Sequence, residues 1–271
     1  MTLPRVGVFD SGVGGLTVLR AMAAQLPAHY LYFGDTARLP YGTKSVETVA
    51  RYAISATRFL EAQGTDLLVI ACNTATALAL PQIKQEASVP VVGVVEPGAA
   101  MAAEVSRSGS AIVIATEATV SSHAYRDALR QRGLAAYEKA CPLFVPLVEE
   151  GWIDHPVTEQ VARIYLDEAM AASSGAADVL VLACTHYPLL TPLLRRITPP
   201  DMHIVDSAES TWREVKTLLA STSQSAAETS VSRDHRSFRF CVTDSTDKFK
   251  RLATRFLGRA VDHVEHIDLG G

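Results

Sequence analysis

One stretch of this sequence occurs twice, 112 residues apart. Residues 66–83 read DLLVIACNTATALALPQI, and residues 178–194 read DVLVLACTHYPLLTPLL. Each copy runs from an aspartate through an apolar segment to Ala-Cys, a polar pair and a second apolar segment. Because the offset is the same for the aspartates and for the cysteines, the copies align without a gap. A repeat of this length predicts two similar half-domains rather than a solenoid, whose units span about 20 to 50 residues.

The two cysteines of the repeat, Cys72 and Cys184, occupy equivalent positions. Each follows an apolar run typical of a buried parallel strand and precedes an apolar run typical of a helix. Open α/β sheets bind their ligands at the carboxyl ends of the strands, where the chain passes into the next helix. The repeat therefore predicts two similar open-sheet α/β domains related by pseudo-symmetry. We expect the two thiols to face each other across the cleft between these domains.

Composition excludes several classes of protein. The formal net charge is −4 and no run of lysine or arginine occurs, so the chain lacks the basic surface that nucleic acid or an anionic membrane requires. No apolar segment is long enough to span a bilayer, and the first apolar run is interrupted at Asp10, too early for a signal peptide. We therefore expect a cytoplasmic protein. The 271 residues suit two domains of roughly 100 to 150 residues.

The four cysteines are Cys72, Cys141, Cys184 and Cys241, and they are widely spaced. The close pairs that are typical of zinc sites and redox dithiols are missing. In a reducing compartment we expect all four to be free thiols. Cys141 and Cys241 lack the setting of the repeat, and we assign them to the core. The sequence predicts neither a metal site nor a lysine in a setting for pyridoxal phosphate.

The order of the predicted strands and helices indicates how the halves are built. We predict a discontinuous first domain of residues 1–96 and 207–271, which carries the first repeat cysteine. The second domain is predicted to span residues 97–206. A final strand and helix in residues 238–257 should return to the first sheet, because such a unit must cover an existing sheet.

Four segments between the predicted elements are interpreted as irregular. Residues 96–98 (EPG) are read as a break in the chain, and residues 116–122 as a hydroxyl-bearing loop after a strand. Residues 141–152 (CPLFVPLVEEGW) are read as an apolar loop punctuated by prolines. The serine-rich tract 221–237 is too polar to bury, and we predict a mobile loop.

A glycine-rich turn, residues 10–15 (DSGVGG), follows the first predicted strand. A turn between a strand and a helix can hold an anion at the helix N-terminus. Its spacing matches neither dinucleotide nor P-loop motifs. Two interpretations stay open: Ser11 caps the helix, or the turn with Asp10 and Ser11 contacts a ligand.

A second loop, residues 34–42, mixes glycine, proline and a phenol. This composition suits a rigid lip over a pocket. Pro40 and Gly42 would stiffen and bend the lip. Tyr41 either packs against the loop or contacts a ligand.

Paired thiols at the starts of helices have a defined chemistry. A helix N-terminus stabilises a thiolate and can lower the pKa of a cysteine below about 8.5. If two thiols flank one carbon, one can remove a proton while the other delivers a proton to the opposite face, which inverts a stereocentre. We expect Asp10 to assist Cys72 and His186 to assist Cys184 by sharing a proton. Glu150 either assists His186 or is solvated, and inert burial is the alternative for the thiols.

Six motifs in order along the chain resemble those of glutamate racemases, within the wider aspartate/glutamate racemase group. They are GVFDSGVGGLTVLR (7–20), YFGDTARLPYGTKS (32–45), ACNTATA (71–77), ACPLFVPLVEEGW (140–152), ACTHYPLL (183–190) and VDSAES (205–210). Together they span nearly the whole chain. The set is far more specific than any one motif alone.

The resemblance implies cofactor-independent interconversion of L- and D-glutamate, which supplies D-glutamate for peptidoglycan. It implies an active site in the cleft between two α/β domains, with Cys72 and Cys184 as acid/base thiols and Asp10 and His186 as their polar partners. The substrate-binding residues that it implies are Asp10, Ser11, Tyr41, Gly42, Asn73, Thr74, Thr185 and His186. Pro40, Thr116, Thr119 and Glu150 are further candidates.

Rival functions stay open at this point. The thiol pair specifies the type of reaction, but it does not specify the side chain of the substrate. The substrate could therefore be aspartate, another small amino acid or a hydantoin. The chain could also be a non-catalytic protein that binds an acidic amino acid. A homodimer is a further hypothesis for its assembly.

Overall fold

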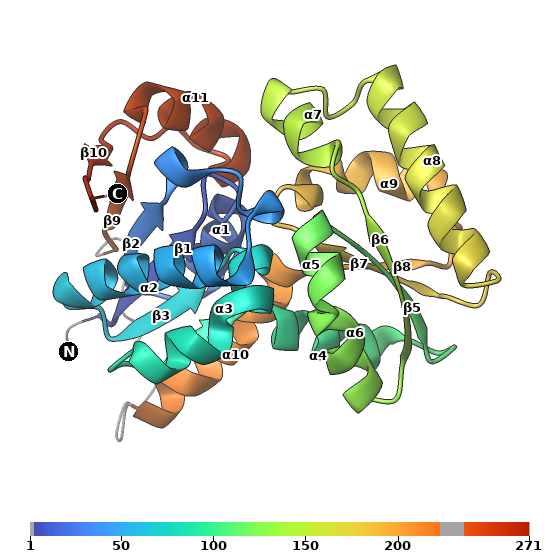
Figure 1. Ribbon diagram of the computed structural model, residues 1–271, viewed down its shortest axis with the longest axis horizontal. Helices are drawn as coiled ribbons and strands as arrows, with labels where there is room; N and C mark the ends of the chain where they lie inside the picture. Colours follow the sequence, from blue (N-terminus) through green and yellow to red (C-terminus); the bar gives the residue numbers. More distant parts are fainter. Residues whose placement is uncertain (1–2, 223–235, 271) are drawn as a thin grey trace.

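The computed structural model describes residues 3–222 and 236–270 and contains two parallel β-sheets (Figure 1). The first sheet has the order β10 (Glu265–His266), β9 (Phe238–Val242), β2 (His29–Gly34), β1 (Arg5–Asp10), β3 (Leu67–Ile70), β4 (Val91–Gly93). The second has the order β6 (Ala135–Ala140), β5 (Ser110–Ala115), β7 (Val179–Ala183), β8 (His203–Asp206). All strand pairs among the described residues are parallel.

The two sheets repeat one topology. The order β2-β1-β3-β4 in the first sheet corresponds to β6-β5-β7-β8 in the second. The strands that precede the repeat cysteines, β3 and β7, therefore occupy equivalent places, and the predicted fold class is confirmed. The first sheet gains two strands because β9 pairs with β2 and β10 with β9. The C-terminal segment thus returns to the first sheet, while the domain limits at residues 96 and 206 stay a prediction.

Helices cover both faces of each sheet (Figure 1). They are α1 (Leu16–Gln25), α2 (Val46–Ala62), α3 (Asn73–Glu86), α4 (Val95–Val105), α5 (Glu117–Ser122), α6 (Ala124–Gln131), α7 (Phe144–Glu150), α8 (Pro156–Ala172), α9 (Thr191–Ile197), α10 (Ser207–Thr222) and α11 (Thr246–Leu257). Three short 3₁₀ turns are η1 (Thr36–Arg38), η2 (Tyr41–Thr43) and η3 (Tyr187–Leu190). Among the described residues, no helix is long and apolar enough to cross a membrane.

The central strands are buried on both faces, which explains why they read as continuous apolar runs. In β1, Val6 and Val8 face one core with α1 and α11, whereas Phe9 faces a second core with α2 and α3. In β7, Leu180 and Leu182 join the first of these cores. One apolar cluster therefore continues from the first half into the second and fixes the two halves against each other.

Three segments that were expected to be irregular contain regular structure. The EPG segment at 96–98 lies in the first turn of α4, where a proline is tolerated because its missing N–H has no partner in the helix. Helix α5 lies in residues 116–122, and helix α7 lies in residues 141–152. The two helices span only 6 and 7 residues, too few for a periodic pattern. Most of the serine-rich tract, residues 223–235, lies outside the described residues.

Strand β6 was also missed. Its sequence, AAYEKA, is an edge strand that is only half-buried. An edge strand with one solvent-facing side lacks the apolar run that identifies central strands.

Candidate active site

Each repeat cysteine lies where a central strand ends. Cys72 is the N-cap of α3, where its sulfur accepts a hydrogen bond from the backbone N–H of Ala75 (3.4 Å). The thiol also lies 3.4 Å from Ser11 Oγ, to which it donates. Cys184 follows β7 directly, and the chain then turns through Thr185 and His186 into η3. Both thiols are free and more than nine-tenths buried.

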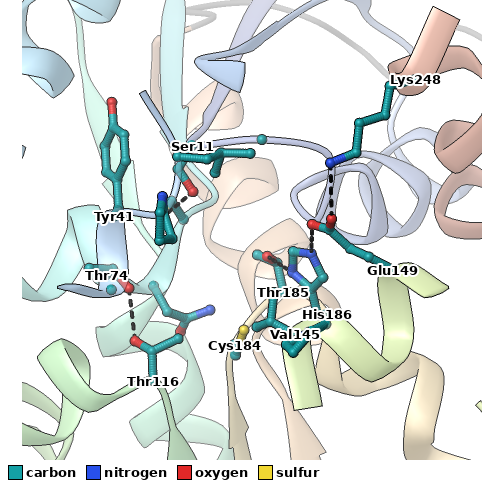
Figure 2. Close-up of a pocket in the computed structure, with 17 residues that line it drawn as sticks. Ser11, Tyr41, Thr74, Thr116, Val145, Glu149, Cys184, Thr185, His186 and Lys248 are labelled. Atoms are coloured by element: carbon teal, nitrogen blue, oxygen red, sulfur yellow. Dashed lines mark hydrogen bonds and ion pairs between the residues drawn. The ribbon is translucent and has the colours of Figure 1, made fainter. Parts of the chain in front are cut away.

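Both thiols line one cavity of about 260 Å³ between the two halves. Figure 2 shows Cys184 among the residues that line it. The lining residues are Ser11, Gly12, Leu39, Pro40, Tyr41, Gly42, Cys72, Asn73, Thr74, Thr116, Val145, Pro146, Glu149, Cys184, Thr185, His186 and Lys248. The volume is just below the roughly 300 Å³ at which pockets for drug-sized ligands begin. The cavity therefore has room for a molecule no larger than a small metabolite.

Hydroxyl groups from both halves meet at one side of the cavity. Thr74 Oγ1 at the start of α3 lies 3.0 Å from Thr116 Oγ1 and 3.2 Å from Thr119 Oγ1, and the last two are 2.9 Å apart. Thr116 lines the cavity, whereas Thr119 lies behind it and supports the other two. Because hydroxyls donate and accept, this group can orient a polar ligand.

The glycine turn packs directly on the second half. A Cβ at Gly14 would lie 2.2 Å from Thr185 Oγ1 and 2.5 Å from His186 Nδ1, so only glycine fits there. Thr17 Oγ1 donates to the carbonyl of Thr185 (3.0 Å) across the same junction. The proposed cap at Ser11 is wrong, because α1 begins after Gly15 without a side-chain cap. Ser11 lines the cavity instead.

Tyr41 belongs to the lip but turns its phenol away from the cavity (Figure 2). Its hydroxyl donates to Asp35 Oδ2 (2.5 Å), and its ring lies 6.3 Å from that of Phe9 and 5.9 Å from that of Tyr52. The residue lines the cavity, yet its ring is part of the core. Of the two interpretations of Tyr41, packing describes the phenol.

Asp10 lies at the end of β1 beneath the cavity and is not among its lining residues. Its Oδ2 accepts from the backbone N–H of Gly12 (2.9 Å), while its buried Oδ1 has no hydrogen-bond partner among the described residues. Burial raises the pKa of Asp10, against the hydrogen bond from Gly12 and the charge of His186. A buried carboxylate oxygen without a donor is well suited to receive a proton.

The carboxylate that contacts His186 is Glu149, not Glu150. Glu149 Oε1 lies 3.2 Å from His186 Nε2, and the other ring nitrogen lies 3.5 Å from Thr185 Oγ1. The hydrogen bond with His186, followed by the charges of His186 and Lys248, holds the pKa of Glu149 below its usual value despite burial. Glu150 is exposed and borders a different, apolar groove.

Neither thiol has the lowered pKa that the helix N-termini suggested. Burial, together with the charge of Asp10, raises the pKa of Cys72 to about 11, although hydrogen bonds with Ser11 and Ala75 act in the opposite direction. Burial raises the pKa of Cys184 further. Removal from water costs a thiolate more than a few partial charges restore. Both thiols are therefore protonated near neutral pH, and a neighbouring group must take up the proton when one reacts.

Asn73 is held by residues from two other helices. Its Oδ1 accepts from the Tyr125 hydroxyl on α6 (2.6 Å), and its Nδ2 donates to Ser207 Oγ on α10 (3.4 Å). These contacts fix the orientation of an amide that lines the cavity. Within the described residues, no group of three histidine, cysteine, aspartate or glutamate side chains could hold a metal ion.

With two parallel sheets and a pair of buried thiols on one cavity described, the chain can be compared with known proteins. Residues 6–215 match the model of the Asp/Glu/Hydantoin racemase family, and the chain belongs to this family of isomerases. Its relatives within the family are more specific. A glutamate racemase of Koribacter versatilis is 58% identical over 286 residues, which cover 99% of this chain and 98% of the relative.

Solved structures agree with the sequence relatives. The glutamate racemase of Thermus thermophilus, in complex with β-chloro-D-alanine, is 43% identical with a TM-score of 0.86 and covers 98% of this chain and 97% of its own. The glutamate racemase of Francisella tularensis, in complex with D-glutamate, is 32% identical with a TM-score of 0.88, covering 99% of both chains. The likeness thus extends over the whole chain and both sheets.

Proposed function

We propose that this protein interconverts L- and D-glutamate without a cofactor, through acid/base chemistry of Cys72 and Cys184. The observation that carries the proposal is that two equivalent buried thiols, one from each half, line a single small cavity. The family is one of racemases, and glutamate is the substrate named for relatives of high identity. We further propose that the product D-glutamate is used for peptidoglycan synthesis in the cytoplasm.

The reaction moves one proton off the α-carbon and another onto its opposite face. One thiol must act as a thiolate that takes the α-proton, and the other gives its own proton to the carbanion. Because both thiols are protonated near neutral pH, the reacting one first passes its proton to a neighbour. The unpaired Oδ1 of Asp10 would receive it near Cys72. The ring of His186, held by Glu149, would receive it near Cys184.

The cavity supports binding of an acidic amino acid mainly by neutral donors. Hydroxyls of Ser11, Thr74 and Thr185, the amide of Asn73 and the backbone of Gly42 line it. The N-terminus of α3, which spans 14 residues, adds a positive partial charge beside Cys72. A substrate carboxylate could therefore be held without arginine.

Turnover of single enantiomers tests this function. Purified protein should racemise L- and D-glutamate without added cofactor and in the presence of a chelator, as followed by optical rotation. The same protein should turn over aspartate far more slowly. Faster turnover of aspartate than of glutamate would make aspartate the substrate. Tight binding of glutamate without turnover would favour a binding protein.

The homodimer stays a prediction, which sedimentation at several concentrations tests.

A further inference from the structure

Helix α11 reaches from the first half onto α7 of the second half. It follows β9 of the first sheet, and Figure 1 shows it on the same side of the molecule as α7. Arg255 Nη1 donates to the carbonyls of Val148 (2.9 Å) and Glu149 (2.8 Å). Both carbonyls lie in the last turn of α7, where helix acceptors are commonly satisfied by side chains, and the Val148 carbonyl also accepts from the backbone N–H of Gly151 (3.0 Å). Arg255 thus caps a helix that belongs to the other half.

The end of α7 is shaped to admit this arginine. Gly151 ends the helix with φ 87°, and a Cβ there would lie 2.5 Å from Arg255 Nη2. The backbone conformation therefore favours glycine, and the absence of a Cβ leaves room for the guanidinium in its present position. The contact between α11 and α7 is part of the fold rather than a chance approach of a surface side chain.

The same helix also reaches the side chains of Glu149 and His186. Lys248 Nζ lies 3.6 Å from Glu149 Oε2, while Glu149 Oε1 contacts His186 (Figure 2). Phe256 packs its ring edge-to-face with the imidazole, with centroids 4.9 Å apart. Helix α11 therefore holds Glu149 at its backbone and its carboxylate, and it supports the ring of His186.

A carboxylate on one ring nitrogen determines the tautomer and orientation of a histidine. With Glu149 on Nε2, the other nitrogen faces Thr185, the residue after Cys184. A shift of Glu149 would rotate the imidazole relative to that thiol. Misplacement of a reacting group by about 1 Å can reduce a rate by about 100-fold.

We propose that Arg255 and Lys248 are positioning residues for racemisation, which act from the first half on the Glu149–His186 pair beside Cys184 in the second half. This inference rests on the proposed function. Arg255 sets where the backbone of Glu149 lies, and Lys248 holds its carboxylate. The contact also makes the geometry beside one thiol depend on how the two halves are seated.

Arg255 is tested by a matched set of variants. Arg255→Met should lower kcat for glutamate by about tenfold or more with little change in KM, because the pair shifts while the binding donors stay in place. Arg255→Lys should recover part of the loss. Arg251→Met, at an exposed position one turn earlier on α11, should match the unaltered protein. Since the enantiomers have equal free energy, kcat/KM must fall equally in both directions.

Lys248 is tested by the pH profile. The charged or titratable groups that act on the Glu149 carboxylate are His186, Lys248 and Asp10, and the Arg255 guanidinium lies at the Glu149 backbone carbonyl. The hydrogen bond with His186 lowers the pKa of Glu149 most, and Lys248 lowers it further. In Lys248→Met the pKa of Glu149 rises. As the pH falls, Glu149 therefore becomes protonated at a higher pH in this variant than in the unaltered protein, and activity that needs the ionised carboxylate is lost earlier. The acid limb of kcat/KM should move upward while Tm stays unchanged, because the ion pair is partly exposed. Lys250→Met should leave the limb in place.

Several outcomes contradict the inference. A rise in KM alone for Lys248→Met would make the lysine a substrate contact, and a lower Tm with unchanged kcat for Arg255→Met would make the arginine purely structural. If the unaltered protein racemises glutamate and Arg255→Met, Arg255→Lys and Lys248→Met all behave like it, the positioning role is refuted and the proposed function stands. An unaltered protein without racemase activity refutes the function itself.

Discussion

At the scale of single residues, the positions of the two thiols could be predicted from the sequence, but their protonation state could not. Cys72 and Cys184 follow from the register of the repeat alone. Their raised pKa values follow from burial in a tertiary structure, which outweighs the helix N-terminus that the sequence reveals. The choice between Glu149 and Glu150 also needs structure. Neighbours on a helix point about 100° apart, so only one of them faces His186.

The raised pKa of Cys72 predicts its reactivity towards iodoacetamide. In the folded protein, the alkylation rate of Cys72 should rise about tenfold per pH unit up to about pH 11, because only the thiolate reacts. In urea the rate should level off near the ordinary pKa of about 8.5. Mass spectrometry of peptides gives the rate for each cysteine. A plateau below about pH 8.5 in the folded protein would show the opposite shift.

The proposed roles of the two thiols predict the effect of removing each. Cys72→Ala and Cys184→Ala should each lower racemisation by about 100-fold to 10⁴-fold, the usual contribution of general acid/base catalysis. Circular dichroism should show an unchanged fold. Cys241→Ala, which removes a buried thiol that does not line the cavity, should keep its activity. Full activity in either of the first two variants excludes chemistry that needs both thiols.

At the scale of elements, the long ones followed from sequence and the short ones did not. The buried strands and the helix over residues 46–62 carry clear patterns, and Ser45 caps that helix. Helices α5 and α7 are too short for periodicity, yet α7 brings Glu149 to the cavity and α5 brings Thr119 to the hydroxyls of Thr74 and Thr116. Asn73 was predicted, but its partner Tyr125 was not, because only the packing of α3 against α6 brings them together.

The contact between α3 and α6 predicts the effect of Tyr125→Phe. Without the hydroxyl, the buried Oδ1 of Asn73 loses its donor, which should cost about 1 to 3 kcal/mol of unfolding free energy. The side-chain amide of Asn73 would also be free to rotate, so KM for glutamate should rise. Urea denaturation and steady-state kinetics measure both effects. As a control, Tyr165→Phe removes a hydroxyl at a half-exposed site and should change the free energy of unfolding by no more than about 0.5 kcal/mol. Equal losses of unfolding free energy in the two variants contradict the prediction.

At the scale of the whole molecule, the cavity exists only because the two halves face each other. The repeat predicted equivalent sheets, and the strand orders agree. It could not predict how closely they approach: Gly14 lies against Thr185 and His186, and an apolar cluster runs through both halves. Nor could it predict that α11 crosses to α7, because this helix lies outside the repeated part of the chain.

Racemisation in heavy water tests most directly whether two thiols on opposite sides of one substrate carry the reaction. L-Glutamate is incubated with the protein in ²H₂O, and the enantiomers are separated at low conversion and weighed by mass spectrometry. Because the thiol that delivers the proton has equilibrated with solvent, the D-glutamate formed should carry one deuterium at Cα while the remaining L-glutamate carries little. D-glutamate that keeps its original hydrogen, or equal early labelling of both enantiomers, would indicate a single base and contradict the two-thiol mechanism.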